Sequence, residues 1–423
     1  MRLVYTVTLL LTLPLLMVRL WWRSRLLPAY RQRWLERMGF GLPRAGSERP
    51  LIWIHAVSVG EVVVASKLIR RLLDEYPDHE IFVTTTTPTG SERLRQTWGD
   101  QVSHSYLPWD LPWAMAGMFN RLKPTAVFLI ETEIWPNLVA QAKTHLVPVV
   151  LLNARLSARS ARGYGKFGAL LKPTLQSLDL IVAQSKADVR RFVALGVDPK
   201  RLVISGNIKF DQLLTPDLRV QAAEIRQQWG GHTRQIWVAA STHEGEEKLV
   251  LRAYGELVKQ HPNLLLCLVP RHPDRFDRVF QMALTACANT IRRSRSPEIK
   301  ADTQVVVADT MGELVPMLGA ADVVFMGGSL VPTGGHNMLE AAQWGVAVVS
   351  GPHTFNFAYA SRLLLKAHAM LIAKDAEELA FIVSGLLSNA TTRGTMGSRG
   401  QIAVEGGRGA LERLVQAIKP LLA

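Results

Sequence analysis

The sequence has little cysteine and lacks several motifs that identify a cofactor. Only two of its 423 residues are cysteine, Cys267 and Cys287, and neither stands in a metal-ligand pattern, so a disulfide framework and a zinc site are excluded. There is no Walker loop, and no G-x-G-x-x-G follows the first expected strand, which disfavours NAD. No platform of interleaved aromatic and basic residues stands out, so nucleic acid is not expected as a partner.

Positive charge is plentiful but unevenly placed. The net charge is +14 at pH 7, and residues 1–210 hold 28 Lys and Arg against 15 Asp and Glu, whereas residues 211–423 hold 21 against 20. A basic surface suits anionic lipid or a phosphorylated substrate. We therefore expect the anionic partner on the first half, although a merely soluble basic surface is the simpler alternative.

The amino terminus carries the longest apolar run. Leu3 to Val18 is free of charge, and Leu20, Trp21 and Trp22 extend the run past Arg19, so that it is just long enough to cross a bilayer. No small-residue cleavage site follows, so a signal peptide fits poorly. Arginines follow the run instead, which predicts a body on the cytoplasmic side. Residues 1–22 are interpreted as a membrane anchor that either spans the bilayer once or lies in one leaflet.

The rest of the chain alternates short apolar runs with amphipathic stretches, which is typical of parallel sheets wrapped by helices. The expected strands are Leu51–Ala56, Ile81–Thr84, Ala126–Ile130, Val147–Leu152 and Leu180–Ala183, then Gln235–Ala240, Leu264–Val269, Gln304–Val307, Asp322–Phe325 and Ala347–Val349. The clearest expected helices are Val62–Glu75, Asp188–Leu195, Thr242–Gln260, Asn337–Trp344 and Ala410–Lys419. Two doubly wound domains follow, residues 23–210 and 211–423, with ligands at their strand ends in a central cleft.

Carboxylates stand where two strands of the first series end. Glu61 follows Leu51–Ala56 at a strand-to-helix turn and is a candidate general base, or simply a favourable residue in a first helical turn. Glu131 and Glu133 follow Ala126–Ile130 directly, where packing explains them poorly. Lys209, in the expected inter-domain connection from Gly206 to about Leu218, can stabilise a departing phosphate.

The second series carries a candidate nucleotide site. Arg271 follows a strand, Met311, Gly312 and Glu313 open a helix, and Ser329 follows the next strand. The segment Thr333 to Ala341 is a glycine-rich loop running into a helix, whose N–H groups can bind an anion. Glu340 can accept ribose hydroxyl protons, and His336 is interpreted as a loop residue rather than a metal ligand.

Several of these segments occur in one order that resembles a known family. They are W-I-H-A-V-S-V-G-E, I-E-T-E-I-W-P-N, N-A-R-L-S-A-R-S, G-N-I-K-F-D, P-R-H-P-D-R-F and G-G-H-N-M-L-E. Together they look like the transferases of 3-deoxy-D-manno-octulosonic acid (Kdo) of Gram-negative bacteria, from the N-terminal anchor to about residue 360. The order is far more specific than any single segment.

The resemblance implies a GT-B fold with an acceptor domain followed by a CMP-Kdo domain. It implies Glu61 as proton acceptor and Glu131 and Lys209 in transition-state stabilisation. The CMP contacts it implies are Pro270, Arg271, Met311, Gly312, Glu313, Asn337, Met338, Leu339 and Glu340. The acceptor is then the lipid A precursor lipid IVA at the cytoplasmic face of the inner membrane, and Arg155, Arg159 and Arg162 could face its phosphates. No Asp-x-Asp occurs, which fits an inverting transfer without metal or cofactor.

Two alternatives remain open from the residues alone. One is a GT-B relative that uses another nucleotide sugar, or an epimerase of similar fold. The other is a basic, membrane-tethered binding protein without catalysis, for which Glu61 is dispensable.

Overall fold

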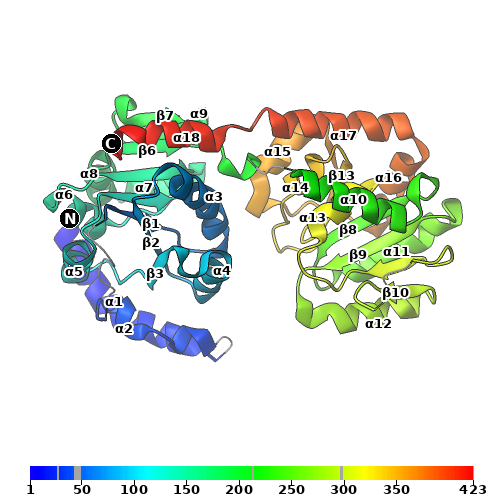
Figure 1. Ribbon diagram of the computed structural model, residues 1–423, viewed down its shortest axis with the longest axis horizontal. Coiled ribbons are helices and arrows are strands. Elements are labelled where there is room, and N and C mark those ends of the chain that lie inside the picture. The colour runs from blue at the N-terminus through cyan, green and yellow to red at the C-terminus, as the bar shows by residue number, and fades with distance from the viewer. Residues whose placement is uncertain (26–27, 42–48, 167, 212–213, 296–298, 423) are drawn as a thin grey trace. The chain divides into compact units, whose positions relative to one another are not determined.

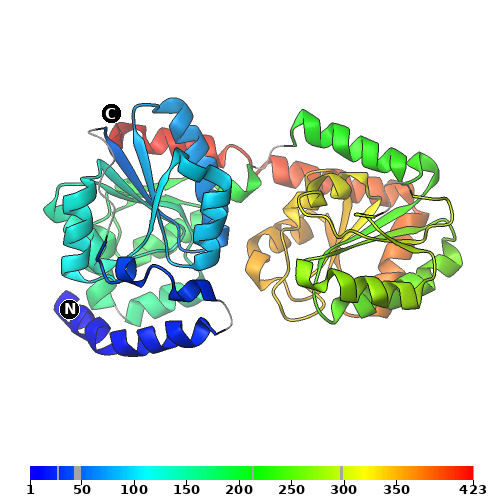
Figure 2. The same cartoon turned by 60° about the horizontal axis from the view of Figure 1, so that its bottom comes forward.

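The computed structural model describes residues 1–25, 28–41, 49–166, 168–211, 214–295 and 299–422 (Figures 1 and 2). The chain forms two compact units, unit 1 from residues 1–211 with 408–423, and unit 2 from residues 212–407. The expected second domain of residues 211–423 was therefore wrong at its end, because residues 408–423 pack with unit 1. Residues 212 and 213 of the expected connection lie outside the described residues.

Unit 1 is built on a parallel sheet of seven strands in the order β3-β2-β1-β4-β5-β6-β7. The strands are β1 (Leu51–His55), β2 (Glu80–Thr85), β3 (Ser103–Tyr106), β4 (Ala126–Ile130), β5 (Val149–Ala154), β6 (Leu180–Ala183) and β7 (Leu202–Ile204). The order reverses at β1 and β4, which pair with Ile52 opposite Ala126. In a doubly wound sheet ligands bind beyond the carboxyl ends of the strands at this reversal.

Helices cover both faces of this sheet because its strands are apolar on both sides. Alternate residues of β1 divide between two cores, with Ile52 and Ile54 in one and Leu51 and Trp53 in the other. The first core is closed by α3 (Val59–Glu75), α4 (Pro88–Trp98) and α18 (Ala410–Ile418). The second is closed by α5 (Pro112–Leu122), α6 (Pro136–Thr144), α8 (Gly168–Gln176) and α9 (Lys186–Ala194), and α1 (Arg2–Arg23) packs on its rim. Two shorter helices, α2 (Trp34–Arg37) and α7 (Ala158–Lys166), complete the unit.

The C-terminal helix α18 belongs to unit 1 because a carboxylate caps it there. Asp211, the last residue of unit 1 before the crossing, accepts hydrogen bonds from the N–H of Gly409 (2.6 Å) and of Leu411 (2.5 Å). Leu414 and Ile418 then join the same core as Ile52. Figure 1 shows α18, in red, lying over this unit.

Unit 2 repeats the design with seven parallel strands in the order β10-β11-β9-β8-β12-β13-β14. They are β8 (Ile236–Thr242), β9 (Leu265–Pro270), β10 (Thr290–Arg292), β11 (Val305–Val307), β12 (Val323–Met326), β13 (Ala347–Ser350) and β14 (Met370–Ile372). One face is covered by α11 (Glu246–Gln260), α12 (Phe276–Ala286) and α16 (Ala376–Ser388). The remaining helices are α10 (Pro216–Gln228), α13 (Leu314–Ala320), α14 (Leu339–Ala342), α15 (Ala358–Lys366) and α17 (Ala390–Glu405).

The expectation of two doubly wound α/β domains is confirmed, and every expected strand is present within two residues of its predicted ends. The four strands without a prediction, β3, β7, β10 and β14, are the outer strands of the two sheets. They are three or four residues long, and β3 reads Ser-His-Ser-Tyr. Edge strands need no continuous apolar run, so hydrophobic periodicity misses them. The expected helix Thr242–Gln260 starts too early, because β8 continues to Thr242 and α11 begins at Glu246.

Candidate active site

Glu61 lies in the first turn of α3, immediately after β1. Its carboxylate accepts a hydrogen bond from the Val57 N–H (2.5 Å), and Ser58 Oγ lies 3.5 Å away. These contacts fix the side chain back over the strand end. The pKa of Glu61 is raised to about 8, and burial is the largest cause. The negative charges of Glu133 and Glu131 also raise this pKa, and together they outweigh the two hydrogen bonds, which lower it. A carboxyl group with this pKa is a strong base for its type.

Glu131 and Lys209 form an ion pair at the neighbouring strand end. Lys209 Nζ lies 2.8 Å from Glu131 Oε1, and both side chains are partly exposed. Glu131 follows β4 with a left-handed backbone at φ 65°, a conformation uncommon outside glycine and often found at functional positions. Lys209 lies on the 3₁₀ turn Ile208–Phe210, whose first N–H is held by Asn153 Oδ1 at 3.2 Å.

Glu133 makes the third carboxylate of this group. Burial first, and the charge of Glu131 second, raise the pKa of Glu133 to about 7. His55, at the end of β1, is fully buried, with Nδ1 2.9 Å from Thr84 Oγ1. Burial lowers the pKa of His55 to about 3, so this imidazole is neutral. The strand ends of unit 1 thus bring Glu61, Glu131, Glu133 and Lys209 together.

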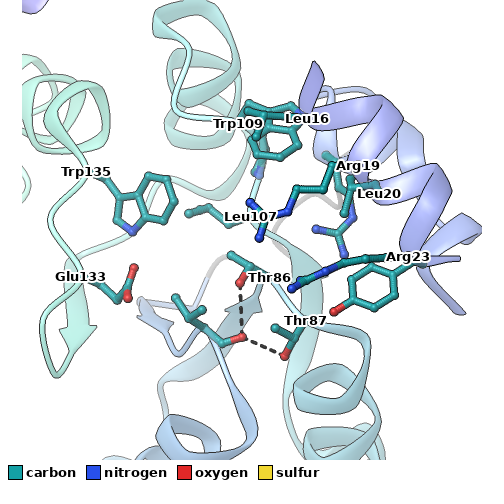
Figure 3. Close-up of a pocket in the computed structure, with 14 residues that line it drawn as sticks. Leu16, Arg19, Leu20, Arg23, Thr86, Thr87, Leu107, Trp109, Glu133 and Trp135 are labelled. Carbon is teal, nitrogen blue, oxygen red and sulfur yellow. Dashed lines mark hydrogen bonds between the residues drawn. The ribbon is translucent and has the colours of Figure 1, made fainter. Parts of the chain in front are cut away.

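A cavity of about 370 Å³ opens beside these carboxylates (Figure 3). Its wall is lined by Leu16, Arg19, Leu20, Arg23, Tyr30, Arg37, Val57, Thr86, Thr87, Leu107, Pro108, Trp109, Glu133 and Trp135. Figure 3 shows Arg19 and Arg23 on the side opposite Glu133 and Trp135. The hydroxyl groups of Thr86 and Thr87 donate to the Val57 carbonyl at 3.3 and 3.1 Å, which holds the loop that positions Glu61. The cavity therefore joins an acidic end to a basic end.

Arg37 has the properties of an anion ligand in this wall. It is only 6% exposed, and its guanidinium lies 3.9 Å from the ring centroid of Tyr106. Nε and Nη2 have no hydrogen-bond partner among the described residues, although buried guanidinium groups are normally paired. Burial lowers the pKa of Arg37.

Sequence reasoning missed the arginines of this wall as site residues. It placed Arg19, Arg23 and Arg37 only after the apolar run and pointed instead to Arg155, Arg159 and Arg162, none of which lines the cavity. The available signal was position: Arg19 and Arg23 are four residues apart and so share one helix face.

In unit 2 the expected donor residues lie at the ends of β9, β12 and the strand before α13. Pro270 ends β9, and the N–H of Arg271 donates to the Thr242 carbonyl at 3.0 Å. Met311 is exposed, and Gly312 has φ 91°, a conformation that glycine adopts without strain. Glu313 caps α13 and lies 3.4 Å from Arg293 Nη2.

The glycine-rich loop ends in a weaker anion site than expected. Asn337 Nδ2 donates to Glu340 Oε1 at 3.1 Å, and Met338 and Leu339 are buried. The following helix α14 is only four residues long. One helical turn gives a small dipole, so any anion here depends on loop N–H groups and side chains.

Ser329 was expected at the nucleotide site, and the structure gives it a structural position instead. The buried carboxylate of Glu246 accepts the N–H groups of Gly328 (2.6 Å), Ser329 (2.8 Å) and Leu330 (2.8 Å). Ser329 Oγ donates to the Met326 carbonyl and accepts from the Gly351 N–H at 2.7 Å. These groups are therefore occupied within the protein, and Glu246, which sequence reasoning missed, holds the loop.

A histidine pair lies beside this loop. His243 Nε2 and His336 Nε2 are 2.7 Å apart with nearly parallel rings. Burial, then His243 and Arg271, lower the pKa of His336 to about 4, so His336 is uncharged at neutral pH, and burial also lowers the pKa of His243. Arg271 therefore lies close enough to act on this loop. In the described part of the chain no group of three or more His, Cys, Asp or Glu side chains is arranged to hold a metal ion.

Comparison with known proteins agrees with a chain of two doubly wound α/β units. Two doubly wound units in one chain define a GT-B glycosyltransferase fold. A glycosyltransferase from Rickettsia africae superposes with a TM-score of 0.57 at 13% identity over 89% of this chain and 99% of its own. UDP-GlcNAc 2-epimerase from Neisseria meningitidis gives 0.58 at 12% identity over 87% and 99%. At these identities the likeness shows the fold alone.

Residues 32–212 match the family described as 3-deoxy-D-manno-octulosonic-acid transferase (kdotransferase). The 3-deoxy-D-manno-octulosonic acid transferase of Haemophilus influenzae is 42% identical over 100% of this chain and 99% of its own. The chain belongs to the Kdo transferase family and is a glycosyltransferase. The expected family is confirmed, and the non-catalytic alternative was wrong.

Proposed function

We propose that this enzyme transfers Kdo from CMP-Kdo to lipid IVA in lipopolysaccharide synthesis, by an inverting reaction that needs neither metal ion nor cofactor. Glu61 is the general base. The observation that carries the proposal is a cavity with Glu133 at one end and arginines at the other, whose wall also contains Val57, the residue that donates a hydrogen bond to Glu61. The proposed acceptor is a phosphorylated lipid, whose hydroxyl group needs a carboxylate as base and whose phosphate needs the arginines.

The acceptor hydroxyl attacks the anomeric carbon of Kdo, and Glu61 takes the hydroxyl proton. The bond from that carbon to the CMP phosphate oxygen breaks, and its electron pair leaves with CMP. The products are the Kdo-glycolipid and CMP, with the proton on Glu61. Direct displacement by one hydroxyl inverts the anomeric centre. A carboxylate of pKa about 8 accepts this proton once it is ionised, and its ionised fraction grows as the pH rises toward 8.

The pair of Glu131 and Lys209 serves the charges that develop during this step. The sugar passes through a cationic, oxocarbenium-like state, which the Glu131 carboxylate stabilises. Lys209, held 2.8 Å from Glu131, supplies a cation for the leaving phosphate or the Kdo carboxylate. In unit 2, Pro270, Arg271, Met311, Gly312, Glu313 and the segment Asn337 to Glu340 are proposed to bind CMP.

The arginine end of the cavity is proposed to bind a phosphate of the acceptor. Arg37 offers two buried N–H donors that have no hydrogen-bond partner within the described part of the chain, and Arg19 and Arg23 add two cations from α1. Bidentate guanidinium–phosphate contacts are strong and geometrically specific. Leu16, Leu20 and Trp109 supply the apolar surface that the lipid part requires.

The test is mass spectrometry of lipid IVA after incubation with the enzyme and CMP-Kdo. We expect products heavier by whole Kdo residues and stoichiometric release of CMP, and the spectrum also gives the number of residues added. Transfer from a UDP-sugar with none from CMP-Kdo overturns the proposal. Retention of full activity by Glu61→Ala overturns the assignment of the base.

A further inference from the structure

The N-terminal helix α1 has two apolar faces in different environments. Leu9, Leu13, Leu16 and Leu20 lie at helical spacing on the face that packs on unit 1, where Leu13 and Leu9 join its core and Leu16 and Leu20 line the cavity. The opposite face is exposed, with side-chain exposures of 76% at Leu3, 75% at Leu11, 70% at Leu15, 61% at Val18 and 62% at Trp22. In both Figures 1 and 2 the helix runs lengthwise along unit 1 rather than projecting from it.

Polar contacts fix the amino-terminal part of α1 to the body. Asn137 Nδ2, in α6, donates to Thr6 Oγ1 at 3.0 Å, and Tyr5 donates a hydrogen bond to Asp110. Asn137 and Asp110 are 1% and 0% exposed. If α1 left the body, Asn137 would lose Thr6 as a partner and Asp110 would lose Tyr5. The loss of a hydrogen-bond partner by such a polar group costs free energy. Apolar packing alone does not decide whether α1 lies against unit 1 or in the bilayer, because leucine is as favourable among lipid tails as in a protein core.

The length and hydropathy of α1 do not decide between a helix packed on unit 1 and a helix that crosses the bilayer. The helix of 22 residues is about 33 Å long, close to the thickness of the bilayer core. If it crossed the bilayer, Thr6 would lie about 25 Å from Arg23 along the membrane normal. Asn137, on the globular body, could not then reach Thr6. The two arrangements therefore exclude one another.

The cavity gives an independent reason. Four residues of α1 line it: Leu16, Arg19, Leu20 and Arg23. A helix that left the body to cross the membrane would tilt away from Leu107 and Trp109 and open this wall. The exposed face is flanked by basic groups, with Arg25 stacked 4.6 Å from the ring centroid of Trp21. Indole and guanidinium groups together suit the anionic headgroup layer.

We propose that α1 does not cross the bilayer. It stays packed on unit 1 and lies in the plane of one anionic leaflet, with Leu3, Val7, Leu11, Leu15, Val18 and Trp22 inserted and its opposite face closing the cavity. The helix is then at once the membrane contact and a wall of the site, so the lipid enters the cavity sideways from the leaflet that holds the protein.

The experiment uses the full chain with Cys267 and Cys287 replaced by alanine, in sealed vesicles of the inner membrane with the cytoplasmic face outward. The double variant Thr6→Cys with Asn137→Cys is oxidised and compared with Leu11→Cys with Asn137→Cys, whose first site is on the exposed face. Separately, Arg2→Cys, at an exposed position that lines the same small pocket as Pro136 of α6, is treated with a membrane-impermeant maleimide before and after the vesicles are opened.

We expect a disulfide in the Thr6 pair at several times the yield of the Leu11 pair, and full labelling of Arg2→Cys in sealed vesicles. Equal disulfide yields overturn the proposal, and so does labelling of Arg2→Cys only after the vesicles are opened. Neither readout requires transferase activity, so the result stands apart from the test of the proposed function.

Discussion

Lys209 Nζ and Glu131 Oε1 lie 2.8 Å apart although 78 positions separate them in the sequence. The strand end at Glu131 and the 3₁₀ turn at Lys209 meet because β4, β5, β6 and β7 are successive neighbours in one sheet and Asn153, at the end of β5, holds the turn. We expect Lys209→Ala to lower kcat by about a hundredfold, since it removes a cation from the charge-stabilising pair. Its stability should change by less than about 1 kcal/mol, because the pair is partly exposed.

A matched control for Lys209→Ala is Lys143→Ala. That residue forms an ion pair of 2.6 Å with Asp179, also partly exposed, away from the strand-end carboxylates. Steady-state kinetics and urea unfolding of both variants separate the two effects. Equal kcat in the two variants would contradict the role of Lys209.

Glu61→Gln should lower kcat by about a hundred- to ten-thousand-fold, the range for loss of a general base. CMP binding, measured by calorimetry, should be unchanged because Glu61 belongs to unit 1 and the residues proposed to bind CMP belong to unit 2. Glu75→Gln, at the far end of the same helix, serves as control. An active Glu61→Gln enzyme would remove Glu61 from the mechanism.

The pH dependence follows from the raised pKa of Glu61. Only the ionised base accepts a proton, so kcat/KM should rise with pH and level off above about 8. Of the nearby negative charges, that of Glu133 raises the pKa of Glu61 most. Glu133→Gln should therefore move the rising limb to lower pH, and a limb that stays in place would show that the two carboxyl groups are not coupled.

The same pKa shift affects stability. An unfolded Glu loses its proton near pH 4.3, whereas folded Glu61 keeps it up to about 8. The folded state thus binds the proton more tightly, and its free energy of unfolding falls as pH rises through this window. Glu61→Gln should raise Tm relative to the natural chain at pH 8 but not at pH 4, as measured by calorimetry.

Removal of the two α1 arginines should weaken acceptor binding selectively. The double variant Arg19→Ala with Arg23→Ala should raise KM for the lipid acceptor about tenfold or more and leave KM for CMP-Kdo and kcat at saturating lipid unchanged, because it removes binding common to ground and transition states. Arg25→Ala, which does not line the cavity, is the control. An unchanged lipid KM would exclude the arginine end from acceptor binding.

Glu246→Gln should destabilise unit 2 by about 3 kcal/mol, because a buried carboxylate that holds three loop N–H groups is replaced by an amide with one acceptor oxygen. CMP binding should weaken with it. Glu244→Gln, at an exposed position just before α11, should do neither. Denaturant unfolding and calorimetric titration measure both quantities.

Sequence reasoning predicted the central strands and the residues at their ends, since Ala126–Ile130 is apolar throughout and Glu131 interrupts it. It could not predict that Arg37 is buried in a cavity wall with two guanidinium nitrogens that lack a hydrogen-bond partner among the described residues, because that depends on how α1, α2 and β3 pack. It also misjudged Ser329: the residue follows a strand as expected, but only the fold shows that Glu246 already occupies the surrounding N–H groups. A local sequence pattern predicts where a strand ends, whereas the hydrogen-bond partners of each polar group depend on the tertiary structure.

The return of α18 to unit 1 sets the order in which the protein can be completed during translation. Leu414 and Ile418 cover the core formed by Ile52 and Ile54, yet the ribosome makes them only after all of unit 2. Unit 2 is continuous in sequence and can fold as soon as it emerges. The strand ends that hold Glu61 and Glu131 are therefore synthesised first but gain their full core last, and until then the nascent chain exposes an apolar sheet face beside an apolar helix that is already available to the membrane.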